Sequence, residues 1–204
     1  MSGRQLTSFE HILLGLICAA PSSGYDLKQR FASTPIGVYQ PSSGSLYPAL
    51  RRLERQGLVR AQRQAQPGGS GGPGQSGRQR RVYEPTEAGQ AVHVAWLRVL
   101  AAPDTVSRDL PLHVMRFVMM EHLLPRAEVL AFLRSVADAL AVFTADLEKY
   151  AAAAEFSFAG RHPGLALDHG IDVHRASLRW AERAIAALST ADVAVDPAVD
   201  NAIA

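Results

Sequence analysis

Apolar side chains recur at helical spacing in the first part of the chain. The run at residues 12–17 follows residues 7–10, TSFE, which have the form of a helix-capping box. A buried first helix ending near Pro21 is therefore predicted. Residues 22–24, SSG, are predicted to form a turn. A short second helix follows from Tyr25 to about Phe31, because its apolar positions share one inward face.

A third helix has the sharpest division between an apolar and a polar face. It is predicted to end at Gly57, because glycine suits the left-handed conformation that follows a helix. Pro48 lacks an N–H and is tolerated in a first turn, so the helix is predicted to begin near Gly44 or Ser45. Its inward stripe consists of Leu46, Leu50 and Leu53.

Two predicted strands follow the third helix. Residues 58–62 alternate enough for a strand, and residues 80–84 form its return. Between them, residues 67–77, PGGSGGPGQSG, exclude regular structure. Thr86 then caps a fourth helix that runs to about Leu100. Three helices, a strand, a long loop and a second strand are the order of a winged helix-turn-helix, in which the two strands and their loop form the wing.

The rest of the chain is predicted to be helical. Helices are expected over about 110–124, 125–154 and 165–188. The middle one alternates apolar positions three and four residues apart, which suits a coiled-coil-like partner seam. The seam is Val129, Phe132, Val136, Leu140, Phe143, Leu147 and Tyr150. The predicted fold is mainly α, with a winged helix-turn-helix with a two-stranded wing over 1–86, an all-helical domain over 87–189 and a flexible tail over 190–204.

The charge distribution adds a binding function to this fold. Residues 1–85 contain eleven Lys and Arg against four Asp and Glu, whereas residues 86–204 contain ten against fifteen. Eight of the arginines lie between Arg51 and Arg81, with one acidic residue among them. This asymmetry indicates a polyanion-binding domain joined to a domain with a different function. The alternative is a solvated charged surface with no binding role.

The outer face of the third helix is the main candidate site. Small residues at a helix N-terminus let backbone amides and hydroxyls approach phosphates and base edges, and later arginines suit the DNA backbone. Arginines at the return of the wing suit the narrow minor groove. If the third helix stood alone, a solvated amphipathic helix would be the better interpretation. The predicted DNA-binding residues are Tyr25, Lys28, Ser43, Ser45, Tyr47, Pro48, Arg51, Arg52, Arg55, Arg78 and Arg80.

Other chemistry has little support in the sequence. The GxGxxG pattern at 69–74 has no buried strand before it and no helix after it, so it is not a nucleotide site. His169 and His174 do not share a helical face, which argues against a metal site. The sequence has no nucleophile elbow and no HExxH motif, so we expect neither catalysis nor a bound cofactor. Trp96 and Trp180 are candidates for lining an effector pocket. The alternative is that they are ordinary aromatic residues of the hydrophobic core.

Cellular location follows from two simple observations. The single Cys18 fits a reducing compartment, and no apolar run approaches the roughly 20 residues needed to cross a bilayer. A cytoplasmic protein without membrane contact is therefore expected.

Four stretches resemble the PadR family of bacterial transcriptional regulators. They are ILLGLI at 12–17, SGYDLKQRF at 23–31, PSSGSLYPALRRLERQGLV at 41–59 and RVYEPTEAG at 81–89. The segment RASLRWAERAI at 175–185 is similar to the longer PadR subfamily, whose C-terminal domain dimerises. The resemblance implies a homodimer on a palindromic operator, usually repressing and often regulated by a small aromatic or lipophilic molecule. The enlarged, Gly-rich wing tip departs from the family pattern.

The sequence thus predicts a cytoplasmic, dimeric winged-helix transcriptional regulator rather than an enzyme. The third helix would enter the major groove, and the wing would cross the adjacent backbone or minor groove. Two alternatives from other classes stay open. One is a protein–protein adaptor that docks through the winged helix, and the other is a small-molecule carrier dominated by the helical half. The sequence does not separate repression from activation.

Overall fold

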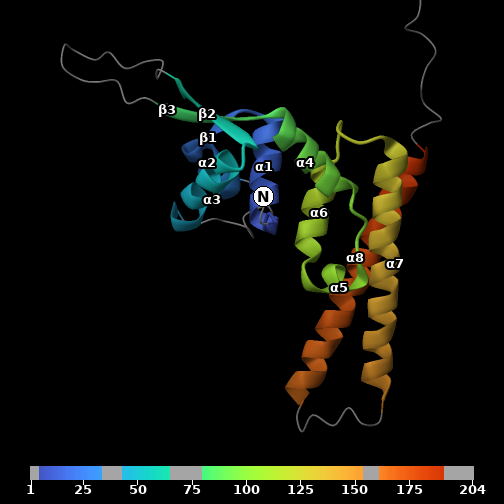
Figure 1. The fold of residues 1–204 in the computed structure, drawn as a ribbon. Coiled ribbons are helices and arrows are strands. Elements are labelled where there is room, and N and C mark those ends of the chain that lie inside the picture. The colour runs from blue at the N-terminus through green and yellow to red at the C-terminus, as the bar shows by residue number, and fades with distance from the viewer. Residues whose placement is uncertain (1–4, 34–42, 65–79, 154–160, 191–204) are drawn as a thin grey trace, which may run out of the picture. The chain divides into compact units, whose positions relative to one another are not determined.

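The computed structural model describes residues 5–33, 43–64, 80–153 and 161–190 (Figure 1). The chain divides into two compact units, unit 1 from Met1 to Leu97 and unit 2 from Arg98 to Ala204. The proposed tail over 190–204 lies, after Thr190, outside the described residues. Within the described ranges, no helix is both long enough and apolar enough to span a membrane.

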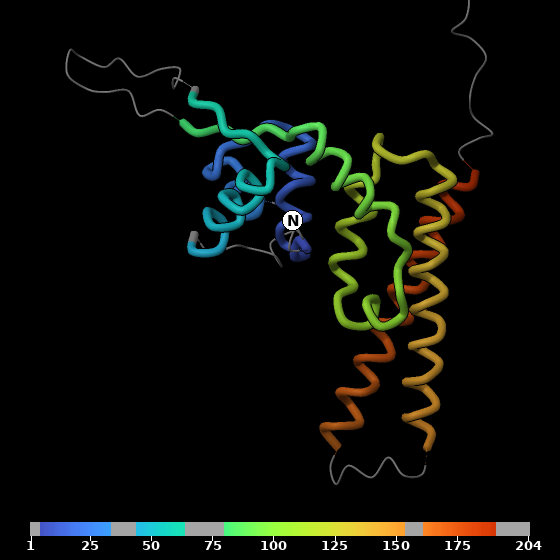
Figure 2. Tube along the Cα trace, in the orientation of Figure 1, coloured from blue at the N-terminus to red at the C-terminus, as the bar shows by residue number. Residues whose placement is uncertain are grey.

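Unit 1 is a winged helix-turn-helix, as the sequence predicted (Figures 1 and 2). Its elements are α1 (Ser8–Ala19), β1 (Ser22–Ser23), α2 (Gly24–Ser33), α3 (Ser43–Arg55), β2 (Val59–Gln64), β3 (Arg80–Pro85) and α4 (Glu87–Arg98).

The sheet of unit 1 has three antiparallel strands in the order β1-β3-β2. Ser22 lies opposite Tyr83, and Gln64 lies opposite Arg80 at the end of the β2–β3 ladder. The prediction of a simple turn at 22–24 was wrong, because two of these residues form β1. Two residues are too short for an alternating pattern to reveal a strand.

Local sequence signals explain where the helices begin and end. The predicted capping box of α1 is confirmed, since the Glu10 carboxylate accepts from the Thr7 amide at 2.8 Å. Gly57 has φ +70° after α3, as expected for a helix C-terminus. Its amide donates to the Glu54 carbonyl at 2.9 Å, completing the last turn. Thr86 caps α4 by accepting from the amide of Gly89 at 3.0 Å.

The core of unit 1 lies between α1, α2, α3 and the sheet. Its fully buried side chains include Ile12, Leu13, Ile17, Leu27, Phe31, Leu46, Leu50 and Leu53. The close approach of α4 to the start of β2 requires a glycine. A Cβ on Gly89 would lie 2.0 Å from the carbonyl oxygen of Leu58.

The described residues of unit 2 form four helices. They are α5 (Pro103–Arg108), α6 (Leu110–Met119), α7 (Arg126–Ala152) and α8 (Arg161–Thr190). The long helices α7 and α8 lie side by side (Figures 1 and 2). The predicted helix over 110–124 is shorter than expected, because its last residues form turns before Pro125. The short helix α5 was not predicted.

The apolar seam of α7 is covered largely by its own chain. Val129, Phe132, Val136 and Leu140 are buried, and α5, α6 and α8 all pack on α7. Tyr150, at the far end of the seam, is half exposed. The predicted coiled-coil-like seam therefore packs in part on helices of its own chain, because repeat spacing identifies an apolar face but not what covers it.

Candidate nucleic-acid interface

Helix α3 buries its apolar stripe and presents its polar side to solvent. Leu46, Leu50 and Leu53 are at most 1 % exposed. The opposite side exposes Gly44, Ser45, Tyr47, Arg51 and Arg55. The orientation of α3 is therefore fixed by hydrophobic packing, which leaves the predicted DNA-binding face outside.

The position of Pro48 differs from the prediction. Helix α3 begins at Ser43, so Pro48 is its sixth residue rather than part of the first turn. A proline there cannot donate to the carbonyl of Gly44, four residues earlier. The side chain of Pro48 is half-buried.

Helix α2 contributes two further exposed side chains, Tyr25 and Lys28, which lie one turn apart. The Tyr25 hydroxyl accepts from the Gln29 amide nitrogen at 2.7 Å. Helix α2 itself is capped by Ser23 and Asp26, because the Ser23 amide donates to the Asp26 carboxylate at 2.9 Å.

A hollow of about 290 Å³ lies where α2, α3 and β3 meet. We call it the α2–α3 hollow. It is lined by Ser23, Gly24, Tyr25, Tyr47, Arg51, Arg80, Arg81 and Tyr83. The lining brings together tyrosine hydroxyls and guanidinium groups, which are donors suited to phosphate oxygens and base edges.

The root of the wing is tied to α2 through Arg80. The Arg80 Nε donates to the Ser23 hydroxyl at 2.9 Å, and its guanidinium forms an ion pair with Asp26. Burial alone would raise the pKa of the Asp26 carboxyl, but hydrogen bonds from Ser23 and Arg80 outweigh it and hold this pKa below its usual value. Arg80 was predicted to contact DNA, and in this structure its guanidinium is bound to α2.

The next residue, Arg81, ties the wing to α3. Its guanidinium donates to Glu54 at 2.6 Å and lies 5.5 Å from the centre of the Tyr83 ring. The hydrogen bond that Arg81 donates to Glu54 raises the pKa of Arg81. Adjacent residues of a strand point to opposite faces, so Arg80 and Arg81 bind different helices.

Arg52 also has a partner within unit 1. It forms an ion pair with Glu10 of α1, which is 4 % exposed. Burial alone would raise the pKa of the Glu10 carboxyl. The hydrogen bonds that Thr7 and Arg52 donate to it have the larger effect and lower this pKa below its usual value. Arg52 therefore joins α1 to α3 as well as lying near the predicted DNA-binding face.

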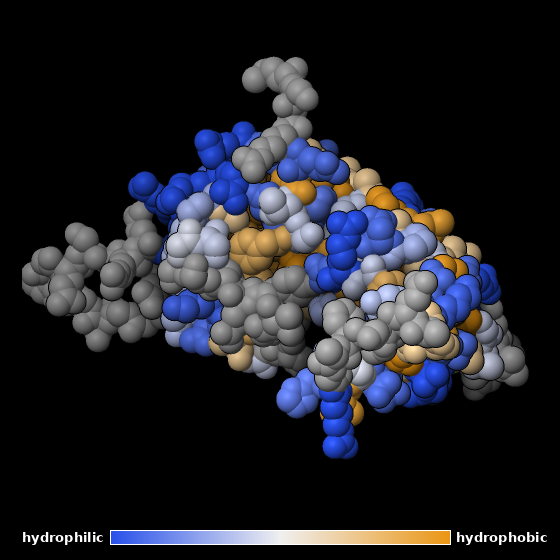
Figure 3. Space-filling view, turned by 90° about the horizontal axis from the view of Figure 1, so that it is seen from below, coloured by the Kyte–Doolittle hydropathy of each residue, from blue (hydrophilic) through white to orange (hydrophobic). Residues whose placement is uncertain are grey.

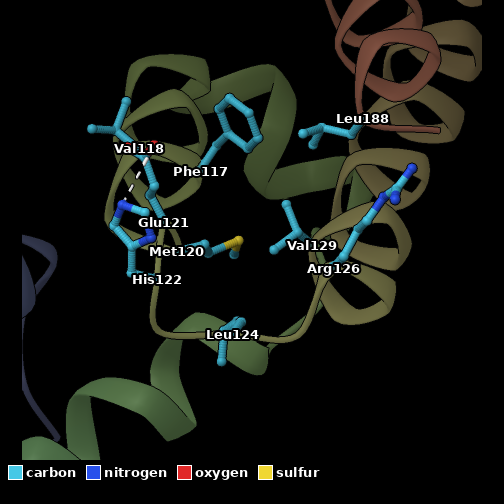
Figure 4. Close-up of a pocket in the computed structure, with 9 residues that line it drawn as sticks. All are labelled: Phe117, Val118, Met120, Glu121, His122, Leu124, Arg126, Val129 and Leu188. Atoms are coloured by element: carbon cyan, nitrogen blue, oxygen red, sulfur yellow. Dashed lines mark ion pairs between the residues drawn. The ribbon is translucent and has the colours of Figure 1, made fainter. Parts of the chain in front are cut away.

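Unit 2 contains an apolar pocket of about 400 Å³ between α6, α7 and α8 (Figure 4). Met120, Val129 and Leu188 point into it, and Glu121 and His122 lie at its edge. Phe117 lines the pocket, and the Trp180 ring packs edge-on against it, with the two ring centres 5.8 Å apart. Trp96, the other predicted effector residue, stacks on His11 in unit 1 at 4.7 Å. Neither tryptophan lines this pocket.

Two family models match the sequence. Residues 13–94 match the transcriptional regulator PadR-like family, and residues 118–189 match the virulence activator alpha C-terminal domain. Residues 13–94 therefore form a PadR-like domain. The first match spans the helix-turn-helix and the wing, and the second spans α7 and α8. The resemblance noted in the sequence is therefore confirmed, and the family is one of transcriptional regulators rather than enzymes.

Several solved PadR structures are similar to the chain at low identity. Bacillus subtilis PadR in complex with operator DNA is 20 % identical, with a TM-score of 0.42 and coverage of 89 % of this chain and 99 % of that one. The same protein with p-coumaric acid is 20 % identical, with a TM-score of 0.38 and coverage of 90 % and 99 %. A PadR-like regulator from Bacillus cereus is 20 % identical, with a TM-score of 0.37 and coverage of 92 % and 99 %. No curated protein matches at a significant level.

The PadR-like domain brings together most of the residues that the sequence singled out. Tyr25, Tyr47 and Arg51 line the α2–α3 hollow, while Ser45, Lys28 and Arg55 are exposed on the same two helices. Ser43 begins α3, and Arg78 lies outside the described residues.

Sequence reasoning missed four residues of the hollow, namely Ser23, Gly24, Arg81 and Tyr83. The SGYD motif at 23–26 is a capping signal that could have placed the first two at the start of α2. Nothing local indicates Arg81, whose partner Glu54 lies 27 residues away. That any of these residues contacts DNA remains a prediction.

Proposed function

We propose that this PadR-like protein is a sequence-specific, homodimeric transcriptional repressor of the cytoplasm that binds a palindromic operator. Helix α3 would lie in the major groove, with the start of α2 and the root of the wing against the flanking backbone. A two-fold dimer would place two such helices about one turn of DNA apart, or a multiple of it.

One observation carries the DNA-binding part of this proposal. The face of α3 opposite the core exposes Ser45, Tyr47, Arg51 and Arg55 beside the α2–α3 hollow. Helix α2 adds Tyr25 and Lys28. Such a surface combines hydroxyl groups for base edges with cations for phosphates, and it supports DNA reading better than an adaptor function.

The test is a fluorescence-polarisation titration against the gene's own upstream region and a scrambled duplex at several salt concentrations. The proposal expects tight, salt-steep binding that favours the upstream region. Equal or absent binding to both duplexes would contradict it and favour the adaptor alternative. A reporter placed behind the same region then separates repression from activation.

The homodimer is supported by the exposed apolar side chains of unit 2. On the face in Figure 3, apolar residues appear in patches between hydrophilic ones. Among the described residues, unit 1 exposes two large apolar or aromatic side chains, Tyr25 and Tyr47, whereas unit 2 exposes nine. We infer that part of this apolar surface is covered in a dimer. The nine are Val99, Leu100, Val114, Val118, Leu123, Val142, Tyr150, Leu165 and Val173.

The pocket of unit 2 supports release by a small effector. Its volume and apolar lining suit a small aromatic or lipophilic molecule. An effector would act by favouring a dimer whose recognition helices no longer match the operator spacing. A Trp96→Phe variant leaves Trp180, next to Phe117, to report binding of p-coumaric acid by fluorescence. A Trp180 response without loss of operator binding would favour a carrier instead.

A further inference from the structure

The aromatic ring of Tyr47 lies directly over the first residue of α2. A Cβ built on Gly24 would lie 2.7 Å from Cε1 of Tyr47, 3.2 Å from Cζ and 3.3 Å from the hydroxyl oxygen. Such distances are shorter than van der Waals contact. The ring therefore occupies the space in which any other residue at position 24 would place its side chain.

The backbone conformation does not explain why this residue is glycine. Among the described glycines, Gly57 has a positive φ and Gly24 does not. Gly24 is the first residue of α2, and its backbone conformation there is open to other residues. What position 24 requires is the missing side chain, because the Tyr47 ring lies there.

The backbone under the ring is held from several sides. Ser23 pairs with Val82 in the sheet and hydrogen bonds to Asp26, and Leu27 is fully buried in the core. Tyr47, by contrast, is 45 % exposed, and the atoms near Gly24 are at the end of its side chain. A methyl group at position 24 would therefore displace the ring and leave the backbone in place.

We propose that Gly24 is a positioning residue for DNA reading, because it sets the place of the Tyr47 ring and hydroxyl at the α2–α3 hollow. The ligand of the positioned hydroxyl is a base edge of double-stranded DNA, so the inference rests on the proposed function. Gly24 itself presents no side chain to DNA. Its effect on operator binding passes through Tyr47.

The test is a double-mutant cycle in the full-length protein, with Gly24→Ala, Tyr47→Ala and both together. Fluorescence polarisation measures their affinity for the upstream duplex and for the scrambled duplex. Gly24→Ala is expected to weaken upstream binding about tenfold and to leave scrambled binding unchanged. In the Tyr47→Ala background the same substitution should have no further effect, because the added methyl group then has space.

The matched control is Gly170→Ala on α8, where an added Cβ meets no atom within 4 Å. It should bind both duplexes like the wild type. Thermal unfolding of all variants shows whether a loss of binding reflects a loss of fold. Gly24→Ala should unfold within a few degrees of the wild type.

Two results would overturn the inference. One is upstream binding by Gly24→Ala equal to that of the wild type. The other is an equal loss whether Tyr47 is present or not, which would mean that Gly24 acts on the backbone. Failure of the proposed function is distinguishable, because the wild type itself would then bind both duplexes alike. In that case the reading role of Gly24 is overturned too.

Discussion

Tyr47 and Arg55 are expected to differ in what they contribute to DNA binding. Tyr47 lies at the α2–α3 hollow near the start of α3, whereas Arg55 is exposed on its last turn. Tyr47→Ala should therefore weaken operator binding about tenfold while affecting non-specific binding less. Arg55→Ala should weaken both alike and reduce the slope of affinity against salt by about one. Unchanged operator affinity in Tyr47→Ala would show that the reading helix is misassigned.

A single buried histidine on α4 should make unit 1 sensitive to acid. His93 is 1 % exposed, and burial together with the nearby His11 lowers its pKa from 6.5 to about 4. As pH falls below 6.5, the unfolded chain takes up a proton that the folded chain resists, so stability is lost between pH 6.5 and about 4.

His93 contributes at most about 1.4 kcal/mol per pH unit to the slope of the free energy of unfolding against pH. Urea unfolding across this range measures it, and His93→Gln should flatten the dependence. His162→Gln, on an exposed position of α8, is the control and should leave it unchanged. An equally steep slope in His93→Gln would assign the acid sensitivity to other groups.

At the scale of elements, α1 and α3 are joined by the ion pair between Glu10 and Arg52. Because the pKa of Glu10 is lowered in the folded state, its contribution to stability is present above about pH 4.5 and is lost as pH falls through the folded value. Glu10→Gln should cost about 1–2 kcal/mol at neutral pH, since it also weakens the cap on α1.

Chemical denaturation at pH 7 and pH 3 measures this difference. The cost of Glu10→Gln should be smaller at pH 3, where the wild-type carboxyl is closer to its protonated form. A cost independent of pH would mean that the charge of Glu10 is not what stabilises the contact.

The junction of α4 and β2 should tolerate no side chain at position 89. A methyl group on Gly89 would meet backbone atoms of Leu58, which cannot rotate away as a side chain can. Gly89→Ala is therefore expected to cost about 3 kcal/mol or more, and to lower the unfolding temperature by more than ten degrees. Gly164→Ala on α8, where no atom lies within 4 Å, should cost nothing. Equal unfolding temperatures for the two variants would contradict the close approach.

The sequence predicted elements best where the deciding contacts are local. The capping box of α1, Gly57 after α3 and Thr86 before α4 each act within a few residues, and all three are confirmed. Ion pairs such as Arg80 with Asp26 join residues 54 positions apart, so no local pattern could indicate them. For the same reason the sequence could select arginines for the proposed DNA-binding face but could not distinguish the exposed arginines from those bound within the fold.

At the scale of the whole molecule, dimer formation should depend on the apolar surface of unit 2. Val142 lies on α7 and is 56 % exposed. Val142→Glu is expected to raise the dimer dissociation constant at least tenfold, because burying a charge in an apolar interface is unfavourable. Light scattering after size exclusion measures the mass across a dilution series. Arg134→Glu, an exposed charged position on the same helix, is the control.

A monomeric wild type in that experiment would contradict the homodimer. A dimeric Val142→Glu variant would place the interface elsewhere on unit 2. Operator affinity should fall together with dimerisation, because two linked recognition helices bind with a higher effective concentration than one.

The pairing of Gln64 with Arg80 closes the β2–β3 ladder, and Arg80 and Arg81 hold that end of it to two helices. Because this end of the ladder is fixed within unit 1, a longer connection between β2 and β3 would cost little free energy, since doubling the length of a loop costs only about 0.6 kcal/mol.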